Sequence, residues 1–469
     1  MRTVLLLCAA LAASARVGAA EVEVWQTVGD GEMKKLIDGP VTTPEEAWQT
    51  ACVDLDAAKP SHPYTGMGGS LGEASCRVLA RLDPVRRRKV LEMLFTRAGA
   101  NLSMVRLHVW SSDYSASIYS YDEVPGDVEM KHFSIDHDRK EVIPMVREAL
   151  AVRPDLFVFS SPWSPPGWMK TNGGPFGGWM KSEYLEAFCD YYVAYLKAYR
   201  EAGIRIRALT IQNEPECGRA GSTTCLWHPE QEARVAGYLL PPRLKAAGLD
   251  VGIWLWDHNY DGFRRVLDQL KDPKVLGAID AVAWHPYCGD ASMLDRVRRA
   301  HPTLRFEQTE MGPALADSVG EPRTLIWWAR KVFDAFNHGC SSFCNWCLVL
   351  DPDGGPNAAE GLSCAGFLAV DAASGVVEPS PQYCLFRHIG PFVEKGASVL
   401  ATSFTTEGYY PHAKDLMAVA FRNPDGSDVV VAACAGEKRG LRRQFQFRKG
   451  GLSHLLSLPC GSVTTFVVK

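Results

Sequence analysis

Two glutamates each follow a short apolar run that is typical of a buried β-strand. Glu214 follows the run at 208–212 through Asn213, and Glu310 follows the run at 304–309. In a barrel of parallel strands the carboxyl ends of all strands meet on one face, so these two side chains would converge on one cavity. Hydrolysis of a glycosidic bond requires two carboxyl groups, one to protonate the leaving oxygen and one to attack the anomeric carbon or activate water. The pair therefore predicts glycosidase chemistry.

Aromatic and polar side chains gather around the same predicted strand ends. Sugar rings pack their C–H faces on indole and phenol rings, while their hydroxyls need fixed polar partners. The aromatic candidates are Trp163, Trp168, Trp254, Trp256, Trp284, Tyr287 and Trp346. The candidate hydroxyl partners are Glu73, Asp113, Asp257, His258 and His285. Core packing is an equal alternative for any single Trp, and we expect Trp254 and Trp284 to point outward, towards helices.

The elements that would position these residues alternate between strand and helix from about residue 60. The eight predicted strands lie at 64–70, 102–109, 156–161, 208–212, 251–256, 281–285, 304–309 and 342–346. Continuous apolar runs of this kind are typical of parallel strands buried on both faces. Between them, Asp83 and Pro84 open a helix that we expect to run to Gly99, and Ser182 opens one that we expect to run to Gly203. Eight such alternations predict an α/β fold, a (β/α)8 TIM barrel.

The two ends of the chain have a different pattern. Residues 21–58 and 391–469 contain alternating runs separated by turn signals, which predicts an antiparallel β-sandwich built from both ends. The expected organisation is a signal peptide at 1–20, an N-terminal segment of the sandwich at 21–58, a catalytic barrel at 59–390 and the C-terminal sandwich region at 391–469. The signal peptide is indicated by Arg2, the apolar run at 4–13 and the small residues at 17–20. We therefore expect a protein that is secreted or delivered to a lysosome-like or vacuole-like compartment.

Composition excludes several classes of function. A net charge of −4 lacks the basic footprint that nucleic-acid binding needs. No Gly-x-Gly-x-x-Gly follows a predicted strand, and the histidines and cysteines have no metal-ligand spacing, so we expect no cofactor and no metal. The run at 68–72 fits Gly-x-Ser-x-Gly, but no Ser–Asp–His order is evident around it, and the run also lies within a Gly-rich stretch that matches this short pattern by chance.

The 14 cysteines fit an exported, partly bridged protein. Cys217 and Cys225 flank a short loop directly after Glu214, and we predict a disulfide between them. Two free thiols beside the cavity are the alternative.

Several motifs, in order, resemble glycoside hydrolase family 30, which contains glucosylceramidases (acid β-glucosidases) and β-1,6-glucanases. The most specific is the Ser-Pro-Trp-Ser-Pro-Pro-Gly-Trp run at 161–168. The others lie at 66–74, 106–121, 210–215, 284–287, 309–310 and 345–357. The resemblance spans roughly residues 60–400.

The resemblance implies a retaining β-glycosidase in which Glu214 is the acid/base and Glu310 the nucleophile. It also places a set of side chains in the sugar-binding subsite: Glu73, Asp113, Trp163, Asn213, Tyr287 and Trp346. We add His285 as a substrate-binding candidate. The main expectation is a glucosylceramidase acting on a β-glucoside or glycolipid with transient contact with membrane lipid, for which Phe176, Trp179 and Met180 offer an apolar surface. The alternatives are a secreted β-1,6-glucanase or a β-xylosidase or β-fucosidase of the same family.

Two positions depart from the glucosylceramidase pattern. Glu73 and Asn345 each stand where those enzymes carry Asp, which leaves the identity of the sugar open. A carbohydrate-binding protein without catalysis is the alternative from another functional class, although it would not need to keep both Glu214 and Glu310.

Overall fold

The computed structural model describes residues 21–29, 31–43, 51–312, 324–358, 364–402, 415–436 and 440–469. The expected signal peptide at 1–20 lies outside the described residues. The chain divides into two compact units. One contains Met1–Pro63, Leu325–Phe333 and Phe392–Lys469, and the other contains Tyr64–Thr324 and Asp334–Pro391.

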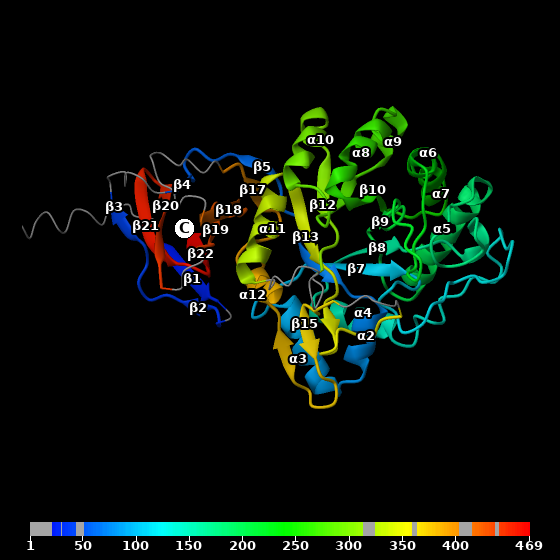
Figure 1. Ribbon diagram of the computed structural model, residues 1–469, viewed down its shortest axis with the longest axis horizontal. Helices are drawn as coiled ribbons and strands as arrows, with labels where there is room; N and C mark the ends of the chain where they lie inside the picture. Colours follow the sequence, from blue (N-terminus) through cyan, green and yellow to red (C-terminus); the bar gives the residue numbers. More distant parts are fainter. Residues whose placement is uncertain are drawn as a thin grey trace, which may run out of the picture. The chain divides into compact units, whose positions relative to one another are not determined.

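The second unit contains a closed eight-stranded parallel barrel (Figure 1). Its strands are β6 (Gly66–Ser70), β7 (Met104–Val109), β8 (Phe157–Pro162), β9 (Ala208–Thr210), β10 (Gly252–Asn259), β11 (Ala281–His285), β12 (Arg305–Gln308) and β13 (Cys340–Asn345). Each strand pairs with its neighbours in chain order, and β13 pairs with β6 to close the ring. The TIM-barrel prediction is confirmed, and every expected strand is present.

Helices follow the barrel strands, as the alternation predicts. They are α2 (Glu73–Ala80), α3 (Pro84–Phe95), α4 (Val142–Val152), α5 (Leu185–Glu201), α6 (Pro229–Arg234), the π-helix η4 (Val235–Leu239), α7 (Leu240–Ala246), α8 (Phe263–Gln269), α9 (Pro273–Ala278), α10 (Leu294–Ala300), α11 (Leu325–Asn337) and α12 (Pro381–Arg387). The Asp83 carboxylate caps α3 by accepting from the amides of Val85 and Arg86. The helix ends at Phe95, short of Gly99. The helix expected from Ser182 begins as a 3₁₀ turn, Ser182–Tyr184, before α5.

Apolar side chains from six strands pack together inside the barrel. They are Met104, Phe159, Ala208, Trp254, Ala281, Ala283 and Cys344. The expectation that Trp254 points outward is therefore wrong. The register of β10 against β11 shifts between Trp256 and His258. Side chains that alternate between the inside and the outside of the barrel after this shift therefore do not predict the side on which Trp254 lies. Trp284 packs against Tyr260 and Phe306.

The first unit is built from two sheets. One has the order β2-β1-β22-β19-β18-β17-β5 and the other β3-β21-β20-β4. Their strands are β1 (Val22–Val28), β2 (Lys34–Lys35), β3 (Val41–Thr43), β4 (Ala51–Asp54), β5 (Pro60–Pro63), β17 (Ser398–Leu400), β18 (Leu416–Arg422), β19 (Asp428–Cys434), β20 (Arg442–Lys449), β21 (Leu452–Pro459) and β22 (Ser462–Val468). All their pairings are antiparallel except β4 with β20, which is parallel. Side chains from both sheets, among them Val430, Phe445 and Phe466, form one apolar core.

The barrel unit also carries a small sheet of β14 (Val349–Leu350), β15 (Leu368–Val370) and β16 (Val377–Pro379). Within the described part of the chain, no helix combines the length and the apolar character needed to cross a lipid bilayer.

The predicted disulfide between Cys217 and Cys225 is absent, and both cysteines are free thiols in the structure. Cys225 is buried next to Lys170, whereas Cys217 is only partly buried and lies near Glu214. The loop between them is held by backbone hydrogen bonds instead, such as that from Trp227 N to Pro215 O at 2.9 Å.

The interior position of Trp254 predicts a large loss of stability on truncation. Trp254→Ala removes a buried indole from the barrel interior and should lower the free energy of unfolding by about 3–5 kcal/mol. Val85→Ala, at a position 66% exposed on α3, is the control and should change it by less than about 0.5 kcal/mol. Urea denaturation followed by far-UV circular dichroism measures both, and equal small effects would contradict the interior placement.

Candidate active site

A buried arginine connects five barrel strands at the centre of the site. Arg106, on β7, is fully buried, and its guanidinium donates to Ser161 Oγ at 3.0 Å, Asn213 Oδ1 at 2.8 Å and Asp257 Oδ2 at 2.8 Å. It also donates to Glu310 Oε2. Because a buried charge must be paired, this cation fixes the ends of β8, β9, β10 and β12 around it.

Asp257 is the fully buried counter-charge of Arg106. Besides Arg106, Asp257 accepts hydrogen bonds from Ser161 at 2.8 Å, Thr210 at 2.7 Å and Thr309 at 2.6 Å. Burial would raise the pKa of Asp257, but the charge of Arg106, the hydrogen bond and charge of His285, and the hydrogen bond from Thr309 hold it far below its usual range. Asp257 is therefore ionised and neutralises the arginine independently of Glu310.

Both oxygens of the Glu310 carboxylate are held by donors. The Tyr287 hydroxyl donates to Oε1 at 3.0 Å, and Arg106 donates to Oε2. The Tyr287 hydroxyl in turn accepts from the amide of Gly312 at 3.0 Å, which fixes the phenol ring. A carboxylate oriented by two donors is suited to nucleophilic attack on the anomeric carbon of a bound sugar.

Glu214 is held in a strained backbone conformation beside two histidines. Its φ of +50° lies in the left-handed region, and its amide donates to Asp257 O at 3.0 Å. Its Oε1 lies 3.1 Å from His285 Nδ1 and 3.5 Å from His258 Nδ1. Burial would raise the pKa of Glu214, but the hydrogen bonds and charges of the two imidazoles lower it below its usual range.

His285 joins Glu214 to Asp257. Its Nδ1 faces Glu214, and its Nε2 lies 3.1 Å from Asp257 Oδ1. Burial lowers the pKa of His285, but the charge of Glu310 and the hydrogen bonds to the two other carboxylates outweigh it and raise the pKa to about 9. The proton of this pair therefore rests on the imidazole, with Glu214 ionised.

The same imidazole limits the separation of the two glutamates. His285 Nδ1 lies 3.1 Å from Glu214 Oε1 and 4.0 Å from Glu310 Oε1, so these two oxygens are within about 7 Å of each other. That limit on the Oε1–Oε1 distance includes the ~5–5.5 Å of a retaining glycosidase and overlaps only the lower end, near ~6.5 Å, of the inverting range.

Aromatic rings form one wall of the site. The Trp163 and Trp346 rings stack with centroids 5.1 Å apart, and His108 packs against both. The Arg106 guanidinium lies 4.7 Å from the Trp163 ring. Gly72 is required here, because a Cβ at this position would lie 2.1 Å from His108 Cε1.

Asp113 offers an unused hydrogen-bond acceptor. Its Oδ1 is buried and has no hydrogen-bond partner among the described residues. Burial, together with the charges of Glu310 and Glu214, raises the pKa of Asp113 to about 7. This oxygen is therefore available to water or to a hydroxyl of a bound ligand.

Glu73 has one oxygen bound and one unbound. Its Oε1 lies 3.1 Å from His137 Nε2, whereas its Oε2 is buried with no partner in the described part of the chain. The His137 ring stacks on Tyr119 with centroids 3.6 Å apart. Tyr119 in turn donates to Asp138 at 2.8 Å, and Asp138 also accepts from two further tyrosines. His137 therefore orients the Glu73 carboxylate from a rigid support.

Three other sequence candidates, Trp168, Trp256 and Asn345, form their hydrogen bonds with backbone carbonyls. Trp168 donates from Nε1 to Asp122 O at 3.1 Å, and the buried Trp256 donates to Asn259 O at 3.0 Å. Asn345 is buried, with its amide directed to Cys347 O at 3.3 Å.

Sequence reasoning missed Arg106 and His137 as site residues. Arg106 could have been recognised in the sequence, because it is a charged residue between the apolar residues Val105 and Leu107 of a predicted buried strand.

One group among the described residues has the geometry to hold a metal ion. The ligand atoms of Glu214, His258 and His285 all lie within 4.8 Å of one another. The contacts of Glu214 and His285 are those of an acid/base pair, so we assign the group to proton transfer.

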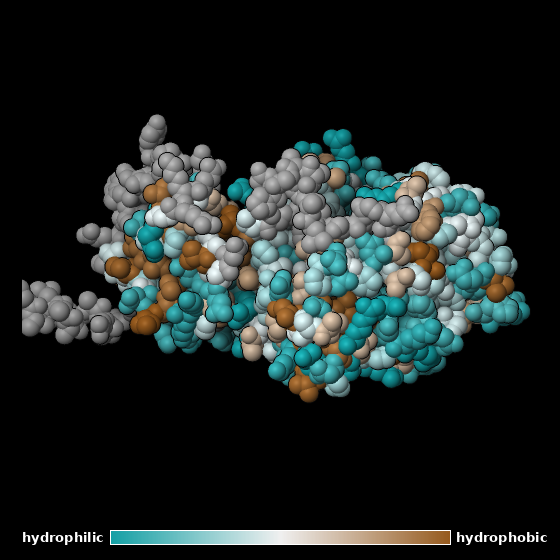
Figure 2. Space-filling model, turned by 60° about the horizontal axis from the view of Figure 1, so that its bottom comes forward, coloured by the Kyte–Doolittle hydropathy of each residue, from teal (hydrophilic) through white to brown (hydrophobic). Residues whose placement is uncertain are grey.

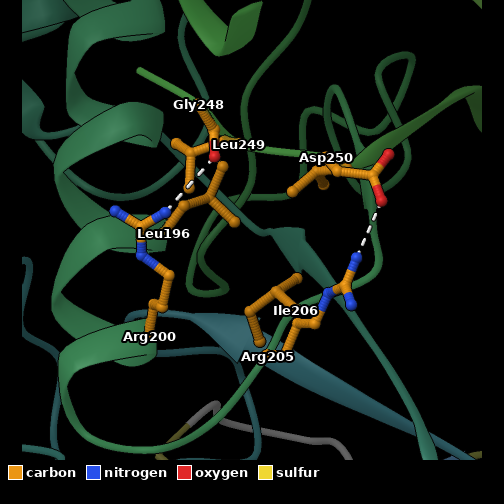
Figure 3. A pocket seen from close by; sticks show the side chains of 8 residues that line it. Leu196, Arg200, Arg205, Ile206, Gly248, Leu249 and Asp250 are labelled. Atoms are coloured by element: carbon orange, nitrogen blue, oxygen red, sulfur yellow. Dashed lines mark hydrogen bonds and ion pairs between the residues drawn. The ribbon is translucent and has the colours of Figure 1, made fainter.

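A separate pocket of about 300 Å³ lies at the amino ends of β9 and β10 (Figure 3). Its cations are paired: Arg205 with Asp250 at 2.7 Å, and Arg200 with Gly248 O at 3.3 Å. In TIM barrels this end serves stability, and catalysis occurs at the carboxyl ends.

The chain is similar to several known proteins over most of its length. Residues 64–393 match the family model described as the glycosyl hydrolase family 30 TIM-barrel domain. An endo-1,6-β-D-glucanase of Neurospora crassa is 32% identical over 82% of this chain and 81% of its own length. The lysosomal acid glucosylceramidase of Mus musculus is 26% identical over 80% of this chain and 76% of its own length.

Among solved structures, SrfJ from Salmonella typhimurium superposes with a TM-score of 0.84 at 26% identity, covering 95% of this chain and 99% of that one. An endo-β1,6-glucanase superposes with a TM-score of 0.83 at 22% identity, covering 95% and 98%, which is a likeness of fold. The chain therefore belongs to glycosyl hydrolase family 30 and is a glycoside hydrolase.

Proposed function

We propose that this glycoside hydrolase is an endo-β-1,6-glucanase that works with retention of configuration. The observation that carries the chemistry is Glu310, fixed by Arg106 and Tyr287, with Glu214 facing it across His285. The substrate proposal is supported by the relative that is 32% identical, whose name is endo-1,6-β-D-glucanase. The glucosylceramidase of Mus musculus is more distant at 26% identity, so we revise the main expectation from the sequence in favour of its alternative.

In the first step Glu310 attacks the anomeric carbon. The bond from this carbon to the leaving oxygen breaks, and the oxygen takes a proton from Glu214. That proton is held by the Glu214–His285 pair, so it passes from His285 Nδ1 through the Glu214 carboxyl. The covalent ester removes the negative charge of Glu310, which lowers the proton affinity of the pair and keeps Glu214 ionised after it has given up the proton. In the second step water attacks the anomeric carbon, the ester bond to Glu310 breaks, and Glu214 takes the proton of the attacking water.

Three polar groups are suited to the hydroxyls of the bound sugar. Asn213 Oδ1 accepts a hydrogen bond from Arg106, so the amide hydrogens of Asn213 are oriented as donors, which suits the 2-hydroxyl. Asp113 and Glu73 each keep a buried oxygen that has no partner among the described residues, and these oxygens would accept hydrogen bonds from other hydroxyls. Trp163 and Trp346 supply the aromatic wall.

The expected signal peptide supports an exported enzyme, as a glucan outside the cell would require. The face drawn in Figure 2 carries its hydrophobic residues in small groups between hydrophilic ones. Glucosylceramide hydrolysis with transient contact with membrane lipid stays the competing proposal, and the substrate test below decides between them.

The function is tested with a substrate panel. We expect the wild type to release products from β-1,6-glucan, with lower kcat/KM on glucosylceramide, aryl β-xyloside and aryl β-fucoside. Glu310→Gln should lower turnover of every substrate by roughly three orders of magnitude or more, while still binding gluco-oligosaccharides. Preference for glucosylceramide would contradict the substrate proposal, and a wild type that binds sugar without turnover would identify a carbohydrate-binding protein.

The Glu214–His285 pair predicts a pH effect. In the wild type the pair keeps its proton up to the pKa of His285, which is about 9. In His285→Gln the proton must rest on Glu214 alone, and a carboxyl group loses it at lower pH. The basic limb of the kcat/KM profile on β-1,6-glucan should therefore move to lower pH.

The control for this pH effect is a dinitrophenyl β-glucoside, whose leaving group needs no proton. The change in kcat/KM between wild type and variant should be much smaller on it. An unmoved basic limb on the glucan would contradict the pair.

The support of Glu73 by His137 predicts a positioning effect. His137→Ala frees a buried carboxylate and should lower kcat/KM for β-glucosides by about tenfold, mainly through KM. His137→Gln, which keeps a donor at the same place, should retain most of the activity. Equal losses in both variants, or loss of thermal stability without a change in KM, would indicate a purely structural role.

A further inference from the structure

Two aromatic side chains are exposed on the loop that follows β8. Phe176 is 38% exposed and Trp179 is 39% exposed. Large aromatic rings are usually buried, so two on one short loop beside a catalytic face indicate a binding role.

This loop is paired with the loop that begins at the acid/base residue. Trp179 forms a β-bridge with Leu226, and Phe176 forms one with Thr223. Leu226 donates from its amide to Gly178 O at 2.9 Å, and Met180 donates to Leu226 O at 3.0 Å.

The partner loop starts directly after Glu214 and is closed by the bond from Trp227 N to Pro215 O at 2.9 Å. The two rings therefore lie on the Glu214 side of the site, where the leaving group departs.

Side-chain hydrogen bonds also join the two loops to each other. Lys170 is fully buried, and its ammonium group donates to Ser164 Oγ and to Thr224 O, both at 2.8 Å. The amide of Gly177 donates to Thr224 Oγ1 at 3.2 Å, and the left-handed φ of Gly177, +55°, allows the sharp turn between the two rings. The rings are thus presented by a rigid frame.

The surroundings of the rings favour a sugar over a lipid chain. Trp179 stacks on the exposed imidazole of His228 with centroids 4.3 Å apart. The charged residues Glu216 and Arg219 are exposed on the partner loop. Stacking surfaces interrupted by polar groups suit a pyranose ring, which has apolar faces and a hydroxylated rim.

We propose that Phe176 and Trp179 form the subsite for the glucose unit on the leaving-group side of the scissile bond. This inference rests on the proposed glucanase function. The subsite explains how the enzyme could cleave a bond inside a glucan chain, because the glucose unit beyond the cleaved bond would have its own stacking surface.

The test compares substrates with and without a sugar on the leaving-group side. Trp179→Ala and Phe176→Ala should each lower kcat/KM on β-1,6-glucan and its oligosaccharides by about tenfold, with kcat/KM on an aryl β-glucoside nearly unchanged. Trp179→Tyr, which keeps a stacking ring, should recover most of the loss. Tyr238→Ala, an exposed aromatic on η4 that is 43% exposed, is the matched control and should change neither.

Each result separates this inference from the proposed function. A wild type without activity on β-1,6-glucan overturns both. A wild type that is active on the glucan and unaffected by the two alanine variants overturns the subsite alone, as does an equal loss on the glucan and the aryl glucoside. A loss confined to glucosylceramide would identify a lipid as the occupant and also overturns it.

Discussion

The site depends on one buried positive charge. Arg106 cannot be solvated where it lies, so the fold must bring it enough acceptors, and those acceptors come from strands that are far apart in the sequence. Asp257 supplies the permanent counter-charge, and the Glu310 carboxylate forms the second ion pair with the guanidinium. The strand ends that satisfy the cation also carry Asn213 and Glu310, so the same contacts that pair the charge orient the carboxylate that we propose as the nucleophile.

Strain accompanies this arrangement. Trp110, Glu214, Trp256 and Asp257 all have positive φ. Trp110 and Glu214 follow the ends of β7 and β9, whereas Trp256 and Asp257 lie within β10, where its register against β11 shifts. Non-glycine residues reach this region only when their surroundings hold them there. Here the holding contacts are visible, as in the amide of Glu214 bonded to Asp257 O and the amide of Trp256 bonded to Glu232 at 2.9 Å. The strain directs Glu214 at the site in place of a regular strand extension.

Much of the fold and the two glutamates could be predicted from the sequence, since eight apolar runs have a strong local signal and motif order is specific. Contacts between distant segments could not. The bond between His137 and Glu73 joins residues 64 positions apart, and no local pattern reports it. Trp254 was placed on the wrong face because a register shift in β10 breaks the alternation on which such counting relies. The disulfide proposed for Cys217 and Cys225 failed because closeness in sequence does not fix the direction of a side chain.

Arg106 also has a consequence for what the cavity would be without its nucleophile. If Glu310 were shortened to a small residue, Asp257 would still hold the guanidinium in place, and a space would open beside a fixed, desolvated cation. Such a space is a receptor for small anions. Formate or azide could occupy it and attack the anomeric carbon in place of the missing side chain, and a glycosyl fluoride with the opposite anomeric configuration would present its halide to the same charge. In such a variant, the framework that we propose for breaking glycosidic bonds would serve to make them.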